Sequence, residues 1–410
     1  MTTKINNEHK KLNVPNLRFK EFQGEWEKTT IGEIATIKNG PFGSVLHAED
    51  YVDEGMPIVT TEHFKSGNLP LSKNGIPQVS EDDYCRLKGY MLETDDIVFS
   101  RVGSVDINAH VEHVQQGWLF SGRVLRVRPI KSVNSLCLHY VLSTESVKRD
   151  IRNRAVGQTM PSINTPILSN TGIYMSQSEA EQKKIANLLS LIDERISTQN
   201  KIIEDLKKLK SAIIDYAINS LDSGFVKFGS LYEMAGEGGT PTTSNASFYD
   251  NGKIPFVKID DLKKKYLTEN KDFITELGLQ KSSAWLVPSR SILFSNGATI
   301  GGITITTYPV CTKQGILGIV PKQNIDVEFL YYFMSSSFFK KAVSRIVTEG
   351  TMKTAYLKDI NNILCPIPTK EKQQEIAKMP SALNSKIDFE QSILKLFCSQ
   401  KQYLLRQMFI

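Results

Sequence analysis

The sequence predicts a mixed α/β (α+β) protein: two similar domains with pseudo-twofold symmetry, separated by a pair of long antiparallel coiled-coil helices. Three observations lead to this prediction. The segment Glu179–Leu221 contains neither Pro nor Gly and repeats apolar residues with a heptad period. A second segment, Lys370–Met408, repeats that pattern, so that Ile185 corresponds to Ile376. The same order of strands, helix and loop precedes both segments, which indicates an internal repeat.

The two long segments are too polar to be buried on all sides and too long to be ordinary packing helices. We therefore expect them to pair along an apolar seam at the a and d positions of one heptad frame. The predicted seam residues are Ile185, Leu188, Ile192, Ile202, Leu206, Leu209, Ile213 and Tyr216 in the first segment and Ile376, Leu383, Ile393, Phe397 and Leu404 in the second.

Polar residues interrupt this seam at corresponding places in the two segments. Arg195 and Gln199 interrupt the first, and Lys386 and Glu390 stand at the matching positions of the second. Two interpretations remain open: the four residues meet in a polar layer that sets the register, with Arg195 paired to Glu390, or they face solvent.

Met379-Pro380 falls inside the second long segment. A proline in a helix interior lacks an amide proton and costs about 3 kcal/mol or more. We therefore expect the second helix to start or kink there.

The regions before the long segments predict two domains with matching elements. Strand-like runs are Pro57–Thr60, Asp96–Ser100 and Arg123–Arg128 in the first domain and Ile254–Val257, Ile292–Gly297 and Ile316–Pro321 in the second. Leu125 and Val127 share one face of their strand, and Arg126 lies on the other. A helix is predicted over 135–151 and again over 327–346, and each is followed by a Thr-Met loop.

Each domain also has a Gly-rich loop, 39–44 in the first and 236–241 in the second. The second lacks the Lys and the strand-to-helix context of a phosphate-binding loop. We interpret it as a turn that lets the backbone approach a neighbouring strand or a nucleic acid.

The charge balance is mildly basic, with 50 Lys and Arg against 44 Asp and Glu in 410 residues. This balance permits nucleic-acid binding but is equally compatible with a soluble protein of no special affinity. The five cysteines form no CxxC pair, the charged N-terminus does not resemble a secretory signal, and no apolar run is long enough to span a membrane. We expect a cytoplasmic protein whose first 13 residues form a disordered tail.

Catalytic motifs are missing from the sequence. It contains no Asn/Asp-Pro-Pro-aromatic loop of an adenine methyltransferase, no GxxxxGK[ST] loop and no metal-ligand spacing of His and Cys. The acidic pairs Asp95-Asp96 and Asp260-Asp261 stand beside strands, where a role in turns or caps is favoured over a nuclease metal site. We expect no catalytic residue and no metal site.

The organisation resembles the specificity subunit of type I restriction-modification systems over essentially the whole chain. The resemblance rests on the Leu17-Arg18-Phe19 opening with Trp26, on the doubled domain-helix arrangement, and on the starts of the helices at 181–185 and 365–376. It implies target recognition domains at 14–176 and 223–368, followed by spacer helices at 177–222 and 369–410.

The family implies that each recognition domain reads one half of a bipartite, asymmetric DNA target. The helices then dock two modification (methyltransferase) subunits, through which restriction (motor-nuclease) subunits join. S-adenosylmethionine, ATP and Mg²⁺ are expected only in those partners, and this chain is expected to be non-catalytic. The Pro380 break and the proline-rich lead-in at 365–368, which stands only before the second helix, imply that the two docking surfaces are not equal.

Basic residues are candidates for phosphate contacts and side-chain amides for base contacts, especially in loops. The candidates are Arg101, Arg123, Arg126, Lys148, Arg149, Arg152, Arg154, Gln158 and Asn164 in the first domain and Asn296, Lys313, Gln314, Lys340, Lys341, Arg345 and Lys353 in the second. A solvated surface role is the alternative for each.

Three other functions remain open from the sequence alone. A coiled-coil scaffold that binds only proteins would show no salt-sensitive DNA binding. An enzyme with an unrecognised active site would be active by itself. A specificity subunit whose system lacks the nuclease would direct methylation without cleavage.

Overall fold

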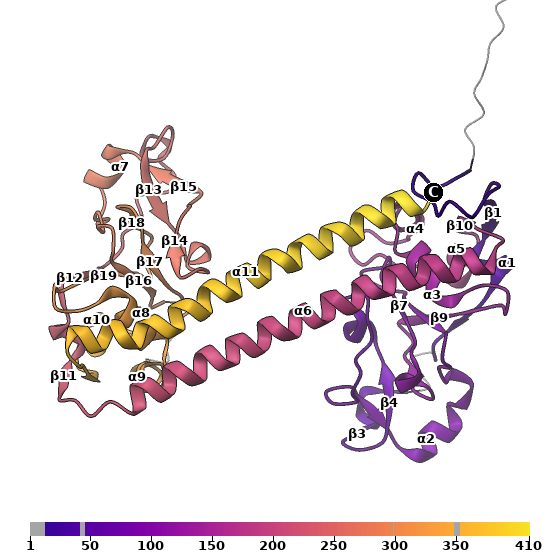
Figure 1. Cartoon of the computed structure of the whole chain (residues 1–410), viewed down its shortest axis with the longest axis horizontal. Helices are drawn as coiled ribbons and strands as arrows, with labels where there is room; N and C mark the ends of the chain where they lie inside the picture. Colours follow the sequence, from indigo (N-terminus) through magenta and orange to yellow (C-terminus); the bar gives the residue numbers. More distant parts are fainter. Residues whose placement is uncertain (1–12, 42–45, 298, 348–352) are drawn as a thin grey trace, which may run out of the picture. The chain divides into compact units, whose positions relative to one another are not determined.

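The computed structural model describes residues 13–41, 46–297, 299–347 and 353–410 (Figure 1). The predicted tail, residues 42–44 of the first Gly-rich loop and the second Thr-Met loop lie outside the described residues, apart from Asn13 at the end of the tail. The chain divides into two units. Unit 1 comprises Met1–Thr198 with Leu394–Ile410, and unit 2 comprises Gln199–Ile393.

Unit 1 contains a four-stranded antiparallel sheet in the order β2-β9-β6-β7. Its strands are β2 (Ala35–Asn39), β9 (Val124–Pro129), β6 (Ile97–Ser100) and β7 (Asn108–His110). A smaller sheet has the order β3-β5-β4-β8, and β1 pairs with β10. These strands are β3 (Tyr51–Val52), β5 (Gln78–Val79), β4 (Met56–Val59), β8 (Leu119–Phe120), β1 (Glu27–Thr30) and β10 (Gly172–Met175). The short helices are α1 (Ile31–Ile34), α2 (Glu81–Arg86) and α5 (Thr165–Ser169).

Unit 2 repeats the main sheet in the order β12-β19-β16-β17 and adds β14 in parallel with β17. Its strands are β12 (Tyr232–Glu237), β19 (Ile316–Pro321), β16 (Ile292–Ser295), β17 (Ile303–Thr306) and β14 (Tyr266–Leu267). A three-stranded sheet β15-β13-β18 and the pair β11–β20 complete the strands. They are β15 (Asp272–Ile274), β13 (Ile254–Val257), β18 (Cys311–Thr312), β11 (Phe225–Lys227) and β20 (Leu364–Pro366). The short helices are α7 (Glu276–Gln280) and α10 (Leu357–Ile360). The predicted mixed α/β architecture with a repeated domain is therefore confirmed.

Each sheet packs its apolar face against helices. In unit 1, Leu125 and Val127 of β9 are fully buried in one cluster with Leu138, as the alternation predicts. In unit 2, Leu317 and Ile319 of β19 occupy the corresponding cluster.

The single helices predicted over 135–151 and 327–346 are each two helices, so that prediction is wrong. The pairs are α3 (Ser135–Leu142) with α4 (Glu145–Arg154) and α8 (Val327–Ser335) with α9 (Ser337–Ile346). The breaks fall at Thr144 and Ser336, whose buried hydroxyls donate to the carbonyls of Val141 and Phe333 at 2.7 and 2.6 Å. Such local bonds compete with the helical ladder, and Ser336 also caps α9.

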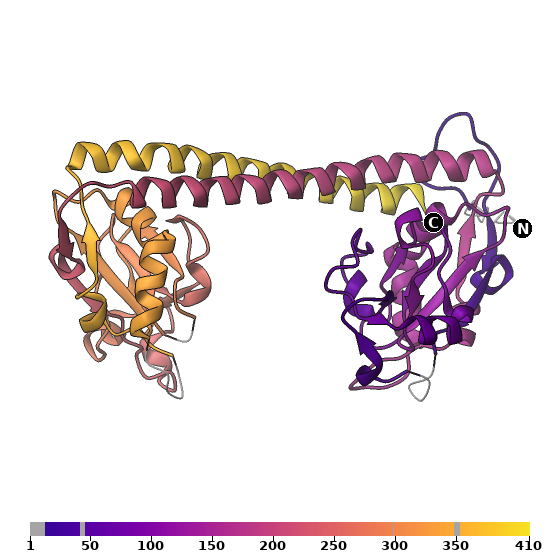
Figure 2. The same cartoon turned by 90° about the horizontal axis from the view of Figure 1, so that it is seen from below.

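The long segments form α6 (Glu179–Asn219) and α11 (Lys370–Met408). Helix α11 runs through the buried Pro380, so the expected start at that residue is wrong. Within each unit the two helices run antiparallel, as predicted (Figure 2). In unit 1, Asp193 of α6 pairs with Lys401 of α11, whereas in unit 2 Lys210 contacts Asn384.

The predicted seam is half right. The a positions Ile185 and Ile192 are buried, but the d positions Ile202, Leu209 and Tyr216 are exposed. The buried positions one residue later are Leu189, Ile203 and Ile214, and Ile218 is buried two residues after Tyr216. The sequence has adjacent apolar pairs at 188–189, 202–203 and 213–214, so spacings of three and four residues fit it equally well and only the packing partner decides between them. The remaining predicted residues are buried or half-buried: Leu188, Leu206, Ile213, Ile376, Leu383, Ile393, Phe397 and Leu404.

A polar layer interrupts the seam in unit 2, but its pairing differs from the one expected. Glu390 accepts hydrogen bonds from Gln199 and pairs with Lys386 at 2.5 Å. Arg195 instead lies over the ring of Phe397, 6.0 Å from its centroid, within unit 1. The amide of Gln199, one turn further along α6, is the group that meets Glu390.

Candidate nucleic-acid interface

In unit 1, three backbone hydrogen bonds hold loops together at one edge of the main sheet. Gly40 N–H donates to Val124 at 3.1 Å, Arg101 N–H to Arg123 at 3.0 Å, and Ile163 N–H to Arg101 at 2.9 Å. We call residues 40–41, 101–103, 121–124 and 156–163 the loop edge of unit 1. This edge gathers four segments that are far apart in the sequence, and it contains three of the predicted contact residues, Arg101, Arg123 and Gln158.

Unit 2 has the same frame at the corresponding edge of its sheet. Gly238 N–H donates to Ile316 at 2.8 Å, Asn296 N–H to Gly315 at 3.0 Å, and Ala355 N–H to Asn296 at 2.9 Å. We call residues 238–241, 296–297, 313–316 and 353–355 the loop edge of unit 2. The two edges share a backbone arrangement but carry different side chains.

A glycine of each Gly-rich loop serves this frame, which agrees with the interpretation of the second loop as a turn that approaches a neighbouring strand. A Cβ atom on Gly40 would lie 2.0 Å from the carbonyl oxygen of Ser121. A Cβ atom on Gly238 would lie 2.2 Å from the carbonyl oxygen of Thr312. No residue larger than Gly fits at either position without moving the backbone opposite.

A cavity of about 490 Å³ opens beside the loop edge of unit 1. Its lining includes Arg101, Ser121, Arg123, Thr60 and Glu62. Arg101 donates from Nη1 to the Gly122 carbonyl at 3.2 Å, but its Nε is buried without a partner among the described residues, as is Ser121 Oγ. Buried donors left unpaired cost about 1–3 kcal/mol each, so this cavity offers polar atoms that an external ligand can satisfy.

The predicted contact residues at the loop edge of unit 2 differ in solvent exposure. Lys313 and Gln314 are exposed on the loop before β19. Asn296 is buried and donates from its amide to the Ala355 carbonyl at 3.2 Å, while its Oδ1 has no partner among the described residues, so that its base contact stays a prediction. The position corresponds to Arg101, and a shorter side chain there is held inside the frame.

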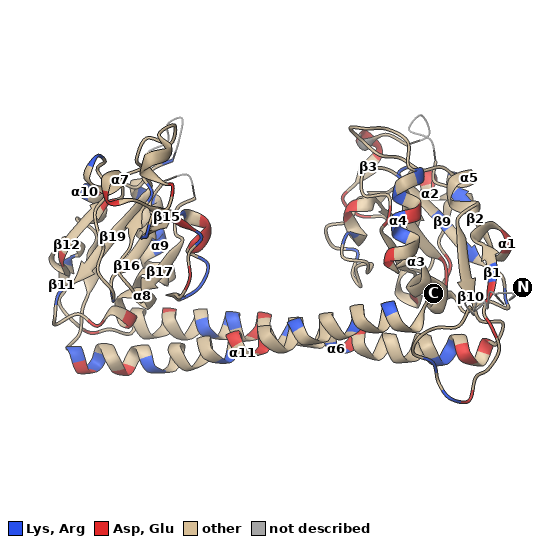
Figure 3. Cartoon of the chain, turned by 90° about the horizontal axis from the view of Figure 1, so that it is seen from above, with Lys and Arg blue, Asp and Glu red and all other residues tan. Residues whose placement is uncertain are grey.

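The cations of α4 are partly neutralised. Arg152 pairs with Asp106 at 2.5 Å and with Glu145, and Arg154 pairs with Asp150 at 3.0 Å. Figure 3 shows both signs of charge along this helix. Such pairs weaken the field available for a phosphate and make Arg152 and Arg154 poorer candidates than Arg101.

The remaining candidates occupy several surroundings. Asn164 caps α5, because its Oδ1 accepts from Ile167 N–H at 2.9 Å. Arg126 is half-buried, and burial lowers its pKa. Exposed or half-buried candidates are Arg123, Lys148, Arg149, Gln158, Lys340, Lys341, Arg345 and Lys353. Ser121 and Thr60 were not predicted, because the cavity that they line forms only when distant loops meet.

A buried glutamine joins the start of each long helix to its globular part. Gln182 accepts from Asn134 N–H at 2.7 Å and donates to the Ser176 carbonyl at 2.8 Å. Gln373 accepts from Asp326 N–H at 2.8 Å and donates to the Pro368 carbonyl at 2.9 Å. Asn134 and Asp326 are the N-caps of α3 and α8. The recurring Gln in the two helix starts therefore has the same structural task in both units.

The N-terminal opening packs against the rest of unit 1. Arg18 Nε lies 2.7 Å from Glu181 Oε1, and the Glu181 side chain is fully buried. Burial raises the pKa of Glu181, but hydrogen bonds from Arg18 and Ser176 outweigh it, so that the pKa lies below its usual value. Trp26 lies edge-on to Phe409, with ring centroids 6.0 Å apart.

Within the described ranges, no group of three or more His, Cys, Asp or Glu residues is placed to hold a metal ion. In the same part of the chain, no helix combines the length and the apolar character needed to cross a membrane.

Comparison with known proteins identifies the repeat. The family described as "Type I restriction modification DNA specificity domain" matches residues 23–208 and again 221–396. The chain is 25% identical over 417 residues to the putative type I restriction enzyme MjaX specificity subunit of Methanocaldococcus jannaschii, covering 93% of this chain and 92% of that protein. It is 26% identical over 168 residues to the EcoR124I/EcoR124II specificity subunit of Escherichia coli, covering 39% and 41% of the two chains.

Solved structures show the same fold. The S subunit of a type I restriction-modification system from M. genitalium superposes with a TM-score of 0.59 at 18% identity, covering 97% of this chain and 99% of that one. A chain from a study of complex assembly and conformational transition in a type I R-M system gives 0.56 at 13% identity, covering 93% and 96%.

Proposed function

Because the chain belongs to the type I restriction-modification DNA specificity family, we propose that it reads a bipartite, asymmetric DNA target with one recognition domain per half-site. The recognition domains are residues 14–176 and 223–368, and the spacer helices are 177–222 and 369–410. The chain itself is non-catalytic and supplies sequence recognition to a methyltransferase and endonuclease complex in the cytoplasm.

The observation that carries this proposal is the pair of loop edges. Three equivalent backbone hydrogen bonds build both edges, yet Arg101 stands in one where Asn296 stands in the other. A shared frame with different side chains presents the same kind of ligand with two different sets of contacts. Two unlike halves of one DNA site are such a ligand, because base edges carry the sequence while the backbone is common.

The helices supply the docking surface in this proposal. Large apolar side chains stay exposed on α6 and α11 within each unit, among them Leu191, Tyr216, Leu396 and Tyr403. Two modification subunits bind there and bring S-adenosylmethionine, and restriction subunits with ATP and Mg²⁺ join through them. The bound modification subunit flips the target adenine out of the duplex and methylates it, because an adenine in a stacked base pair is not accessible to its active site.

The test is to express this chain with a modification subunit from the same source in a host without adenine methylation, and to sequence the modified bases. We expect a bipartite motif with a fixed gap that disappears when this chain is omitted. A stable complex that produces no new methylation would favour the protein-binding scaffold instead.

A chimaera gives a sharper test of one domain per half-site. Exchanging residues 14–176 for the equivalent segment of a relative with a different target should change one half-site and leave the other unchanged. A change in both half-sites, or in neither, contradicts the assignment.

A further inference from the structure

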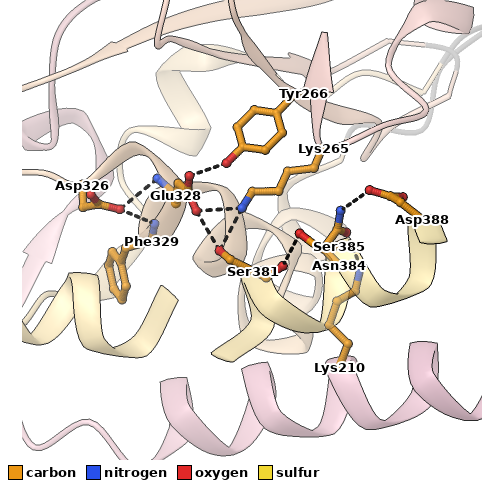
Figure 4. Close-up of polar contacts among 10 residues, drawn as sticks. All are labelled: Lys210, Lys265, Tyr266, Asp326, Glu328, Phe329, Ser381, Asn384, Ser385 and Asp388. Atoms are coloured by element: carbon orange, nitrogen blue, oxygen red, sulfur yellow. Dashed lines mark hydrogen bonds and ion pairs between the residues drawn. The ribbon is translucent and has the colours of Figure 1, made fainter. Parts of the chain in front are cut away.

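A buried lysine connects the globular part of unit 2 to α11. Lys265, just before β14, has a side chain that is only 2% exposed. Its Nζ donates to Glu328 Oε2 of α8 at 2.7 Å and to Ser381 Oγ of α11 at 2.9 Å (Figure 4). The rings of Tyr266 and Tyr332 each have their centroid 4.8 Å from Nζ.

Ser381 is the contribution of α11 to this cluster. Its hydroxyl accepts from Lys265 and donates to Glu328 Oε2 at 2.7 Å, while Tyr266 donates to the other oxygen of the same carboxylate. The cluster therefore contains one cation and one anion, with each charge matched by several hydrogen bonds. Buried charges that are satisfied in this way hold one geometry firmly, since any shift leaves a charge unpaired.

Helix α8 is attached to α11 at a second point. Gln373 of α11 accepts from Asp326 N–H, the N-cap of α8. Gln373 and Ser381 are about two helical turns apart, or about 12 Å along α11. A single attachment allows the globular part to pivot on the helix, whereas two attachments at this distance fix its direction.

Unit 1 has no counterpart of this cluster among its described residues. Leu136 of α3 stands where Glu328 stands in α8, counted from the N-caps Asn134 and Asp326. Ser190 of α6 corresponds to Ser381, but its hydroxyl donates to Asn187 of its own helix at 3.0 Å. Among the described residues, the attachment through a buried lysine, a glutamate and a serine is therefore found in unit 2 and not in unit 1.

We propose that Lys265 and Ser381 are positioning residues that set the gap between the two half-sites accepted by the protein. The inference rests on the proposed function. They act by fixing the direction of the second recognition domain on α11, a helix whose residues belong to both units. They do not read bases, so the preferred sequence of each half-site stays the same when they are changed.

The test compares Ser381→Ala with Ser385→Ala in the full chain bound to its modification subunits. Ser385 lies one turn further along α11, and its hydroxyl donates to the Ser381 carbonyl at 3.3 Å. Methylation rates are measured on duplexes with the wild-type gap and with that gap changed by one base pair. We expect Ser381→Ala to lower the ratio of these rates by about fivefold, the size of effect that corresponds to losing one typical hydrogen bond.

Ser385→Ala should keep the wild-type ratio. An unchanged ratio in a folded Ser381→Ala protein overturns the proposal, and so does a change in the bases preferred within a half-site. A wild-type protein that methylates no bipartite site is a different outcome, because it refutes the proposed function itself.

A second pair of variants tests the charge. Lys265→Met removes the buried cation, and Lys263→Met removes an exposed cation from the same loop, 3.7 Å from Asp260. Lys265→Met should relax the gap ratio at least as much as Ser381→Ala, whereas Lys263→Met should not. If Lys265→Met fails to fold, the serine pair decides the question alone.

Discussion

Lys210 of α6 donates a hydrogen bond to Asn384 of α11 at 3.0 Å, and these two residues occupy the same positions of the repeat as Lys401 and Asp193. In unit 1 the lysine lies on α11 and the acceptor on α6, 2.6 Å apart. The corresponding residues therefore exchange helices between the units. In each unit the acceptor lies on the long helix that follows that unit's globular part in the sequence, which is α6 in unit 1 and α11 in unit 2, and the lysine lies on the other long helix. The acceptor is charged in unit 1 and neutral in unit 2.

This difference predicts the behaviour of Asp193 variants. Asp193→Asn copies the neutral acceptor of unit 2 and should cost about 1 kcal/mol of unfolding free energy, since Lys401 and Tyr140 donate to different carboxylate oxygens and the single amide oxygen keeps only one of these two bonds. Asp193→Leu leaves both donors without an acceptor and should cost more unfolding free energy, about 2–3 kcal/mol. Denaturant unfolding of both variants measures the order, and equal losses would contradict this account of the contact.

Gln373 should matter far more than its neighbour. Gln373→Leu leaves the Asp326 amide and the Pro368 carbonyl without their partner and should lower the unfolding free energy by about 2–3 kcal/mol. Gln374→Leu, at an exposed position one residue later, is the control and should stay within about 0.5 kcal/mol of wild type. Urea titration measures the unfolding free energy of both variants, and equal losses would contradict the prediction.

Glu328 gives a prediction for acid stability. Burial raises its pKa, but hydrogen bonds from Lys265, Tyr266 and Ser381 outweigh this and lower the pKa to about 2, from 4.5. A carboxyl group whose pKa is lower in the folded state than in the unfolded state stabilises the fold at any pH above its unfolded-state pKa. This stabilisation is lost as the pH falls towards the folded-state pKa. The stability difference between wild type and Glu328→Gln should therefore be constant above about pH 5 and shrink from pH 4.5 towards pH 2. A difference that is independent of pH over that range would show that the carboxylate charge is not responsible.

Arg101 is the candidate contact with the clearest structural support. Arg101→Gln should weaken recognition of the half-site read by unit 1 by about 1–3 kcal/mol if the side chain contacts a base. If it contacts a phosphate, the affinity should fall for all DNA sequences. The slope of log K against the logarithm of the salt concentration should then decrease in magnitude by about one. Arg152→Gln, which removes a cation already paired with Asp106 and Glu145, serves as the control. Titration of labelled duplexes at several salt concentrations separates these results, and wild-type binding by Arg101→Gln would exclude the residue from the interface.

Much of the architecture followed from local patterns. The heptad period predicts two long helices because it depends only on residues within a few turns of one another. The alternation around Leu125 and Val127 predicts a strand with one buried face for the same reason. The repeated order of elements predicts two similar units, and the Leu17-Arg18-Phe19 opening with the doubled helix starts predicts the family.

Contacts between distant segments decided the rest. The choice of Ile203 over Ile202 in the seam and the meeting of Gln199 with Glu390 depend on what packs against each helix. The loop-edge cavity and the burial of Lys265 arise from loops that are far apart in the chain. The period and the repeat can be read from the amino-acid sequence, because both are patterns of residues along one stretch of chain. The burial and pairing of polar groups follow from the folded structure, because they depend on which distant atoms replace water around each group.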